Sequence, residues 1–446
     1  MIFKIKQKKM GFCSYKKIIP VLLIAILLKA LQPSIIFASR ILWPSEMNLD
    51  NDTYTISHLL STTAVASDSR KGFLFCGDPN EVFTLGAGHV AVNVTLSGKS
   101  HLMLQHIREL KDRGVKITLI LINDKVPVGV DFRNAPDEMK NPYCYIMDFN
   151  ASNGEWQKFN FDRIVEDYGQ LVDNWIIGNE INSQLYGYYG PATVEEYTKV
   201  YCETFKVAYE KIKEVNSEAD VYISFDQGWD IPNYYAKDRR YDKRLGKYKY
   251  NAKEQIILIN QYLDKKIDWG ISLHPYAEPV DSAFFWDDKY SGLIRDVDDE
   301  LQKPYLTTLK NFEIAIEFMR DKKFLRPDET MRNIIISEFG VTSLNGEREQ
   351  AAALFYMWEK IEKYEEIKLF LYNAQVDLPD GYHFGLTSDK RKRRLAWAVF
   401  KDMDRKDENA WCKDLLDSVL YEHGYFDVDG VVLSQEQVDE LLKNHS

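Results

Sequence analysis

Eight short runs of apolar residues recur along the chain, and longer stretches with apolar positions at helical spacing separate them. Runs of this kind that are rich in β-branched residues are typical of buried parallel strands. We expect strands at residues 72–76, 89–96, 115–123, 172–179, 221–225, 269–273, 333–337 and 368–372. Alternation of strands and helices predicts a parallel sheet, and eight such units favour an α/β fold closed as a (β/α)8 TIM barrel.

The helix between the fourth and fifth strands has the clearest local signal. Thr193 and Glu196 have the spacing of a capping box, in which each side chain accepts a hydrogen bond from the other's backbone N–H. An apolar stripe at helical spacing follows, and it comprises Val194, Tyr197, Tyr201, Ala208 and Ile212. Such a stripe predicts packing against the sheet.

Two of the apolar runs end in a glutamate. The fourth run leads through Gly178 and Asn179 to Glu180, and the seventh leads to Glu338. The loops after the strands form the active-site face of a barrel, so both carboxylates are expected on one rim. A retaining glycosidase needs one carboxyl group to protonate the leaving oxygen and one carboxylate to attack the anomeric carbon. Each glutamate alone reads as an exposed strand end, but two of them at these positions favour catalysis.

Polar and aromatic residues at other strand ends are candidates for binding a substrate. The loops after the third, fifth and sixth strands are long and rich in aromatic residues, and they would all rise on the same face. Aromatic rings suit the apolar faces of sugars, and side-chain amides suit their hydroxyl groups. The candidates are Asn93, Asn123, Asp124, Asp226, Trp229 and Asn373. Loop packing and turn capping are the alternatives for each of them.

Composition limits the kinds of partner. The chain has 446 residues, of which 45% are hydrophobic and 28% charged, as in globular proteins. Its formal net charge is −11, which argues against nucleic acid and anionic membrane as partners. A basic run at 390–394 falls where the last barrel helix is expected to begin, and we interpret it as a solvated helix face.

The first 38 residues have the pattern of an export signal. A lysine-rich head precedes an apolar stretch at 18–28, and Ala38 offers a small residue for cleavage. Lys29, Gln32 and Pro33 interrupt the apolar run, so a stable membrane span is not expected. We therefore expect a secreted protein, with an uncleaved anchor at the cell surface as the alternative. Residues 39–68 are expected to form an N-terminal extension, 69–403 the catalytic barrel and 404–446 a helical tail.

The remaining cysteines do not predict a metal or redox site. Cys76, Cys144, Cys202 and Cys412 match neither a disulfide-dense module nor a zinc site, so buried thiols and a single bridge both stay open. We expect no metal and no cofactor, and we favour a monomer.

The motifs around the two glutamates resemble those of the clan A retaining glycoside hydrolases. Asn179-Glu180 after the fourth strand and Glu338-Phe339-Gly340 after the seventh carry this resemblance, which covers the architecture from about residue 70 to 403. The whole chain also looks similar to secreted clan-A-like barrel proteins of undefined activity. The resemblance implies that Glu180 is the general acid/base, that Glu338 is the nucleophile and that Asn179 binds the sugar's 2-hydroxyl group.

The resemblance also implies roles after the sixth and eighth strands. His274 and Tyr276 would lie beside the nucleophile, and a phenol that donates to Glu338 would keep its carboxylate ionised and oriented. Clan members often carry a tryptophan after the eighth strand as the floor under the sugar, and here Tyr372 and Asn373 stand at that place.

The expected function is therefore a secreted, cofactor-free retaining glycoside hydrolase that cleaves β-linked poly- or oligosaccharides. Clan members usually support the nucleophile with an arginine on an early strand, whereas 72–76 and 89–96 contain none. This departure motivates the alternative, a carbohydrate-binding barrel that has lost catalysis.

Overall fold

The computed structural model describes residues 65–75, 77–100, 102–123, 146–183, 186–187, 192–231, 250–286, 306–378 and 381–424. The expected signal at 1–38, nearly all of the extension at 39–68 and the end of the tail lie outside the described residues. So do Asp124, Cys76 and Cys144.

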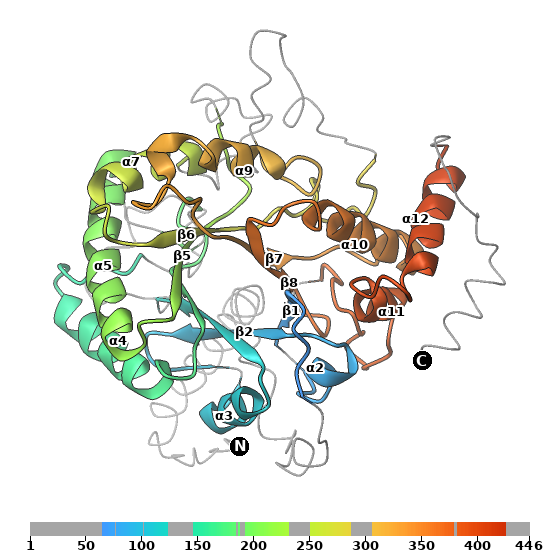
Figure 1. Ribbon diagram of the computed structural model, residues 1–446, viewed down its shortest axis with the longest axis horizontal. Coiled ribbons are helices and arrows are strands. Elements are labelled where there is room, and N and C mark those ends of the chain that lie inside the picture. The colour runs from blue at the N-terminus through green and yellow to red at the C-terminus, as the bar shows by residue number, and fades with distance from the viewer. Residues whose placement is uncertain are drawn as a thin grey trace, which may run out of the picture.

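Eight parallel strands close into a barrel in the order of the chain (Figure 1). They are β1 (Lys71–Leu74), β2 (His89–Thr95), β3 (Lys116–Ile122), β4 (Asn174–Ile177), β5 (Asp220–Phe225), β6 (Trp269–Leu273), β7 (Ile334–Phe339) and β8 (Ile367–Tyr372). Each overlaps one of the apolar runs, and β1 pairs with β8 to complete the closure. The predicted (β/α)8 fold is confirmed.

Helices surround the sheet on its outside (Figure 1). They are α2 (Glu81–Thr84), α3 (Leu104–Asp112), α4 (Gly154–Tyr168), α5 (Val194–Val215), α7 (Ala252–Tyr262), α9 (Glu313–Met319), the 3-10 helix η7 (Lys322–Phe324), α10 (Glu347–Ile361), α11 (Leu395–Asp402) and α12 (Ala410–Glu422). The last of these, α12, begins beyond the expected barrel and packs against α10 (Figure 1). None of the helices in the described part of the chain is long and apolar enough to cross a membrane.

The predicted capping box starts α5. The Thr193 hydroxyl accepts from the backbone N–H of Glu196 at 3.2 Å, and the Glu196 carboxylate accepts from the backbone N–H of Thr193 at 2.9 Å. The stripe behind it is buried at Tyr197, Tyr201 and Ala208, which pack in the layer between sheet and helices. This helix therefore anchors the segment that follows β4.

Apolar side chains fill the centre of the barrel. This inner cluster comprises Leu74, Ala91, Ile120, Ile122, Ile176, Tyr222, Ile335, Leu369, Leu371 and Ala374. A second, larger apolar layer separates the strands from the helices. The barrel is thus a packed core, and a ligand can reach it only at an end.

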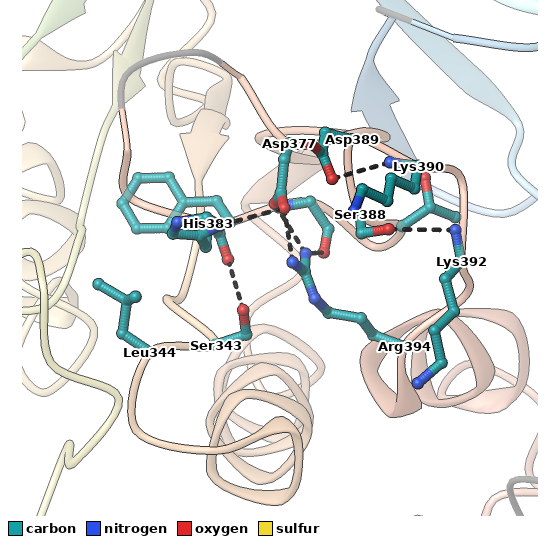
Figure 2. A network of polar contacts seen from close by, with 12 residues as sticks. Ser343, Leu344, Asp377, His383, Ser388, Asp389, Lys390, Lys392 and Arg394 are labelled. Carbon is teal, nitrogen blue, oxygen red and sulfur yellow. Dashed lines mark hydrogen bonds and ion pairs between the residues drawn. The ribbon is translucent and has the colours of Figure 1, made fainter.

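The basic run at 390–394 differs from the prediction. Helix α11 begins at Leu395, and Arg394 precedes it with a side chain that is only 8% exposed. Its guanidinium forms two contacts with the Asp377 carboxylate, at 2.7 and 2.5 Å (Figure 2). The interpretation as a solvated helix face was wrong for this residue, because a buried carboxylate such as that of Asp377 requires a paired cation.

Two cysteines lie in the described residues. Cys202 and Cys412 are both free and buried, and burial raises the pKa of each thiol. Of the two possibilities left open, buried thiols are the one that these residues adopt.

Candidate active site

The chain bends after β4, and the bend brings Glu180 to His274, which follows β6. Gly178 has φ +80°, and Glu180 has φ +45°, a left-handed conformation that costs a residue with a side chain about 1–3 kcal/mol. The turn is held by β5, since Ser224 Oγ accepts from the Glu180 backbone N–H at 3.3 Å and Ser224 O accepts from the Ile181 N–H at 3.0 Å. The general observation is that such strain clusters at functional sites.

Glu338 is placed by an irregularity in β7. The pairing of β7 with β8 shifts register between Ile336 and Phe339, and such a shift re-aims the side chain within it. The Tyr276 hydroxyl donates to Glu338 Oε2 at 3.0 Å. The same hydroxyl accepts from Asn373 Nδ2 at 2.7 Å, so its single proton is directed at the carboxylate.

The two glutamates lie close together around His274. One carboxylate oxygen of Glu180, one of Glu338 and a ring nitrogen of His274 lie within 4.8 Å of one another. His274 Nδ1 is 2.8 Å from Glu180 Oε1 and 3.8 Å from Glu338 Oε2. Carboxyl groups about 5–5.5 Å apart characterise retaining glycosidases, whereas inverting enzymes separate them by about 6.5–9.5 Å. One oxygen of Glu180 and one of Glu338 thus lie within 4.8 Å of each other, which is nearer to the retaining than to the inverting separation.

Buried serines contact His274 at Nε2, the ring nitrogen that does not face Glu180. The imidazole Nε2 lies 2.8 Å from Ser337 Oγ and 3.1 Å from Ser224 Oγ, and Ser272 Oγ hydrogen-bonds Ser337 Oγ. All three serines and His274 are buried, and they come from the adjacent strands β5, β6 and β7. Both ring nitrogens consequently have partners, which fixes the plane of the imidazole.

The pKa values of His274 and Tyr276 are both raised at the site, for different reasons. Burial by itself lowers the pKa of His274, but the negative charges of Glu338, Glu180 and Asp226 and the hydrogen bond to Glu180 outweigh it, so the pKa is raised. Burial, and then the charge of Glu338, hold the pKa of Tyr276 well above its usual value. The site thus favours a protonated imidazole and a neutral phenol that donates.

Several amide oxygens around the site have no hydrogen-bond partner in the described part of the chain. They belong to Asn93 on β2, Asn179 after β4, and Asn373 and Gln375 after β8. A buried acceptor without a partner is costly, and each such group calls for an explanation. Each of these oxygens is buried, and a water molecule or a hydroxyl group that reached it would satisfy it by donating a hydrogen bond.

Two of the predicted substrate-binding residues are corrected by the structure. Tyr372 is fully buried in the layer outside the barrel, and its hydroxyl donates to Phe384 O at 2.8 Å. Trp229 is 2% exposed and packs edge-on against Phe318 with ring centroids 5.4 Å apart. The side chain at the end of β8 points outward because side chains alternate along a strand, and the next residue, Asn373, turns inward.

The other predicted residues occupy different places around the rim. Asn123 donates to Ile146 O at 3.2 Å and to Gln157 Oε1 at 3.3 Å, so its amide fastens the loop after β3. Asp226 is buried, its carboxylate accepts from the Gln227 backbone N–H at 2.6 Å, and its charge acts on His274. Asp124 lies outside the described residues.

Sequence reasoning did not identify Ser224 and Ser337 as parts of the site. A signal was available, since a serine two residues before a polar strand end shares the inward face with it. Ser224 stands in this relation to Asp226, and Ser272 to His274. Ser337 directly precedes Glu338, and the register shift of β7 brings both side chains to the site.

Glu180, His274 and Glu338 are also a possible set of ligands for a cation. The 2.8 Å between His274 Nδ1 and Glu180 Oε1 is an ordinary hydrogen-bond distance, so these groups satisfy each other directly.

Known structures similar to this chain include glycoside hydrolases. A family 39 glycoside hydrolase from Bacteroides cellulosilyticus WH2 matches 76% of this chain at 14% identity with a TM-score of 0.49, and the match spans 64% of that protein. The β-glycosidase from Thermosphaera aggregans matches 76% of this chain at 14% identity and a TM-score of 0.47, over 86% of its own length. A family 1 β-glucosidase from Thermotoga maritima matches 74% at 14% identity and a TM-score of 0.42, over 85% of its length.

These similarities concern the barrel, whose closed parallel sheet is evident from the strand pairing itself. Among curated proteins, no sequence matches the chain significantly. A family model matches residues 99–420, which is well over half of the chain. The chain therefore belongs to the family of unknown function DUF5722.

Proposed function

We propose that the protein is a retaining glycoside hydrolase that cleaves β-linked poly- or oligosaccharides. The observation that carries the proposal is the arrangement of Glu180 and Glu338. One oxygen of each carboxylate lies within 4.8 Å of the other and of a His274 nitrogen, and the Tyr276 hydroxyl donates a hydrogen bond to Glu338. Two carboxyl groups at this spacing, with different hydrogen-bond partners, are equipped for double displacement.

In the first step Glu338 is the nucleophile. One of its oxygens forms a bond to the anomeric carbon while the bond from that carbon to the leaving oxygen breaks, and Glu180 passes to the leaving oxygen a proton that it receives from the His274 imidazolium. The Tyr276 hydroxyl, 3.0 Å from Glu338 Oε2, keeps the carboxylate in position until it attacks.

In the second step Glu180 is the base. It takes a proton from water, the water oxygen bonds to the anomeric carbon, and the ester bond to Glu338 breaks. The proton taken from water returns to His274 Nδ1, which lies 2.8 Å from Glu180 Oε1, and the starting state is restored. The positive imidazole also offsets the repulsion between the two carboxylates.

The substrate of the proposed enzyme is a carbohydrate outside the cell. The unpartnered amide oxygens of Asn93, Asn179 and Asn373 support a ligand that is rich in hydroxyl groups. The export-type segment at 1–38 supports secretion. The enzyme would need no cofactor and would act as a monomer.

A carbohydrate-binding barrel without catalysis is the second candidate. It is motivated by Glu338, which forms no ion pair with an arginine or lysine among the described residues, so the nucleophile has only Tyr276 and His274 as its supports there. Such a protein would hold an oligosaccharide for hours without cleaving it.

The decisive experiment compares five proteins on a panel of 4-nitrophenyl β-glycosides and soluble β-glycans. Wild type should release product, whereas Glu338→Gln and Glu180→Gln should not, and Glu155→Gln, an exposed glutamate on α4, serves as the control. Glu180→Ala with added azide should regain turnover and form a glycosyl azide of retained configuration, because azide needs no general base. Turnover by Glu338→Gln at the wild-type rate would remove the assignment of the nucleophile.

A further inference from the structure

Three aromatic rings form a stack that begins at the candidate nucleophile and runs to the surface. The ring of Tyr276, whose hydroxyl bonds Glu338, stacks on Phe384 with centroids 5.7 Å apart and planes inclined by 25°. Phe384 in turn stacks on Tyr382 at 5.2 Å and 8°. Tyr276 and Phe384 are nearly buried, whereas Tyr382 is 40% exposed. The stack therefore ends in a partly open aromatic ring.

The middle of this stack is fastened to the barrel. Phe384 O accepts from the Tyr372 hydroxyl at 2.8 Å and from Gln350 Nε2 at 3.2 Å. Gly340 leaves room for the ring, since a Cβ at that position would lie 2.9 Å from it. Phe384 thus has a defined position relative to the end of β7, and Tyr382 rests on a fixed support.

Gly385, which follows Phe384 in the loop, is held by the buried ion pair of Asp377 and Arg394. Asp377 Oδ1 accepts from the Gly385 backbone N–H at 2.9 Å, and Arg394 donates to Gly385 O at 2.7 Å while it pairs with Asp377 (Figure 2). Breaking such a pair is costly, so this side of the loop is rigid.

The loop adopts a strained backbone next to Tyr382. Gly381 has φ +83° and His383 has φ +54°, so a residue with a side chain takes a left-handed conformation on one side of the tyrosine. The loop after β7 stabilises this shape, because Ser343 donates to His383 O from its backbone at 3.1 Å and from its hydroxyl at 3.2 Å (Figure 2). A strained backbone that leaves the Tyr382 ring partly exposed contributes little to the stability of the fold, so the exposed ring points to binding.

Leu344 extends the exposed apolar surface on the neighbouring loop. It is 58% exposed, and it follows Ser343, which carries the bonds to His383 (Figure 2). Leu344 and Tyr382 thus lie on two loops that the hydrogen bonds between Ser343 and His383 join.

We propose that Tyr382, supported by Phe384, is a stacking platform for a sugar ring of the substrate chain. This inference rests on the proposed function and deepens it. Phe384 separates Tyr382 from Tyr276, so the sugar on the platform is a distant unit of the chain and not the one that Glu338 attacks. The natural substrate is accordingly an oligosaccharide or polysaccharide long enough to reach both places.

Affinity electrophoresis tests the platform without turnover. Glu338→Gln protein is run in native gels that contain a soluble β-glycan, with separate gels for a β-1,4-glucan, a β-1,3-glucan, a β-mannan, a xylan and a β-galactan. The same variant is made with Tyr382→Ala, with Tyr382→Phe and with Tyr421→Ala, which removes a tyrosine that is 52% exposed on α12. Thermal unfolding confirms that each protein is folded.

We expect one glycan to retard the Glu338→Gln protein and Tyr382→Ala to raise the dissociation constant about tenfold, a loss typical of one aromatic contact. Tyr382→Phe should keep the affinity because it keeps the ring, and Tyr421→Ala should keep it as well. Equal retardation with and without the Tyr382 ring overturns the platform. Retardation by none of the glycans also overturns it, and release of reducing sugar by wild-type enzyme then decides separately whether the proposed hydrolysis stands.

Discussion

The two halves of the barrel interior are built from the same strands and contain opposite kinds of side chain. Tyr222 and Ile335 lie in the apolar inner cluster, and two residues further along the same strands stand Ser224 and Ser337. Both serines form hydrogen bonds with His274, and His274 forms a hydrogen bond with Glu180. One step of two residues along a strand therefore separates the half that stabilises the fold from the half equipped for chemistry.

The comparison shows what makes the polar half tolerable in a packed interior. A series of hydrogen bonds runs from Ser272 through Ser337 and His274 to Glu180. Every buried group in this series has a partner, which compensates the cost of removing it from water. The amide oxygens at the rim are the exception, and they are where a ligand is expected to bind.

The largest effect is expected from the polar half. Glu338→Gln should reduce turnover on the order of 10³-fold or more, because the amide cannot form the covalent bond. The amide keeps the shape of the carboxylate and still accepts from Tyr276, so the midpoint of thermal unfolding should move by less than about 4 °C. A variant that loses activity because it unfolds would contradict the division between the halves.

The apolar half should show the reverse behaviour. Ile120→Ala removes a fully buried side chain from the inner cluster and should lower the free energy of unfolding by about 2–5 kcal/mol. Ile120→Val should cost only about 0.5–1.5 kcal/mol. Urea unfolding measures both, and turnover per folded molecule should stay near that of wild type, since Ile120 lies below the site.

His274 should make the stability of the polar half depend on pH. Its pKa is raised in the folded protein, so the stabilisation from the protonated imidazole is complete below about 6.5, the ordinary value, and is lost as the pH rises through the raised value. The difference in unfolding free energy between wild type and His274→Gln should therefore shrink from pH 6 to pH 9. A difference that grows with pH would mean that the imidazole is neutral at its site.

The smallest effect is expected from the serines. Ser337→Ala removes the 2.8 Å partner of His274 Nε2 and should cost about 1 kcal/mol of stability. Loss of this acceptor also disfavours the protonated imidazole. The stabilisation by His274 should therefore be lost at a lower pH in Ser337→Ala than in wild type. An unchanged pH dependence, measured by urea unfolding at several pH values, would assign the serine to packing alone.

Much of the fold was predictable because it depends on local patterns. Apolar runs marked all eight strands, and the capping residues Thr193 and Glu196 marked the start of α5. The candidate acid/base and nucleophile were also visible as the two glutamates that end buried strands. The strand direction that follows from the βα alternation was enough to place both on one rim.

The errors came where a side chain's direction depends on tertiary structure. Tyr372 and Trp229 follow strands as binding residues do, yet both point into the layer under the helices. Arg394 belongs to a basic run, and only the approach of Asp377 makes it a buried ion-pair partner. The pattern of residue types is the same in either case, so the sequence could not separate them.

The sequence by itself determined the barrel, the two glutamates and the rim that they share, because strand periodicity and strand direction are encoded within short segments. Only the tertiary structure decided that Glu180 meets His274, that Ser224 and Ser337 support the imidazole and that Tyr276, Phe384 and Tyr382 stack. These contacts join residues from different strands and loops, and their distances follow from the closure and register of the whole barrel.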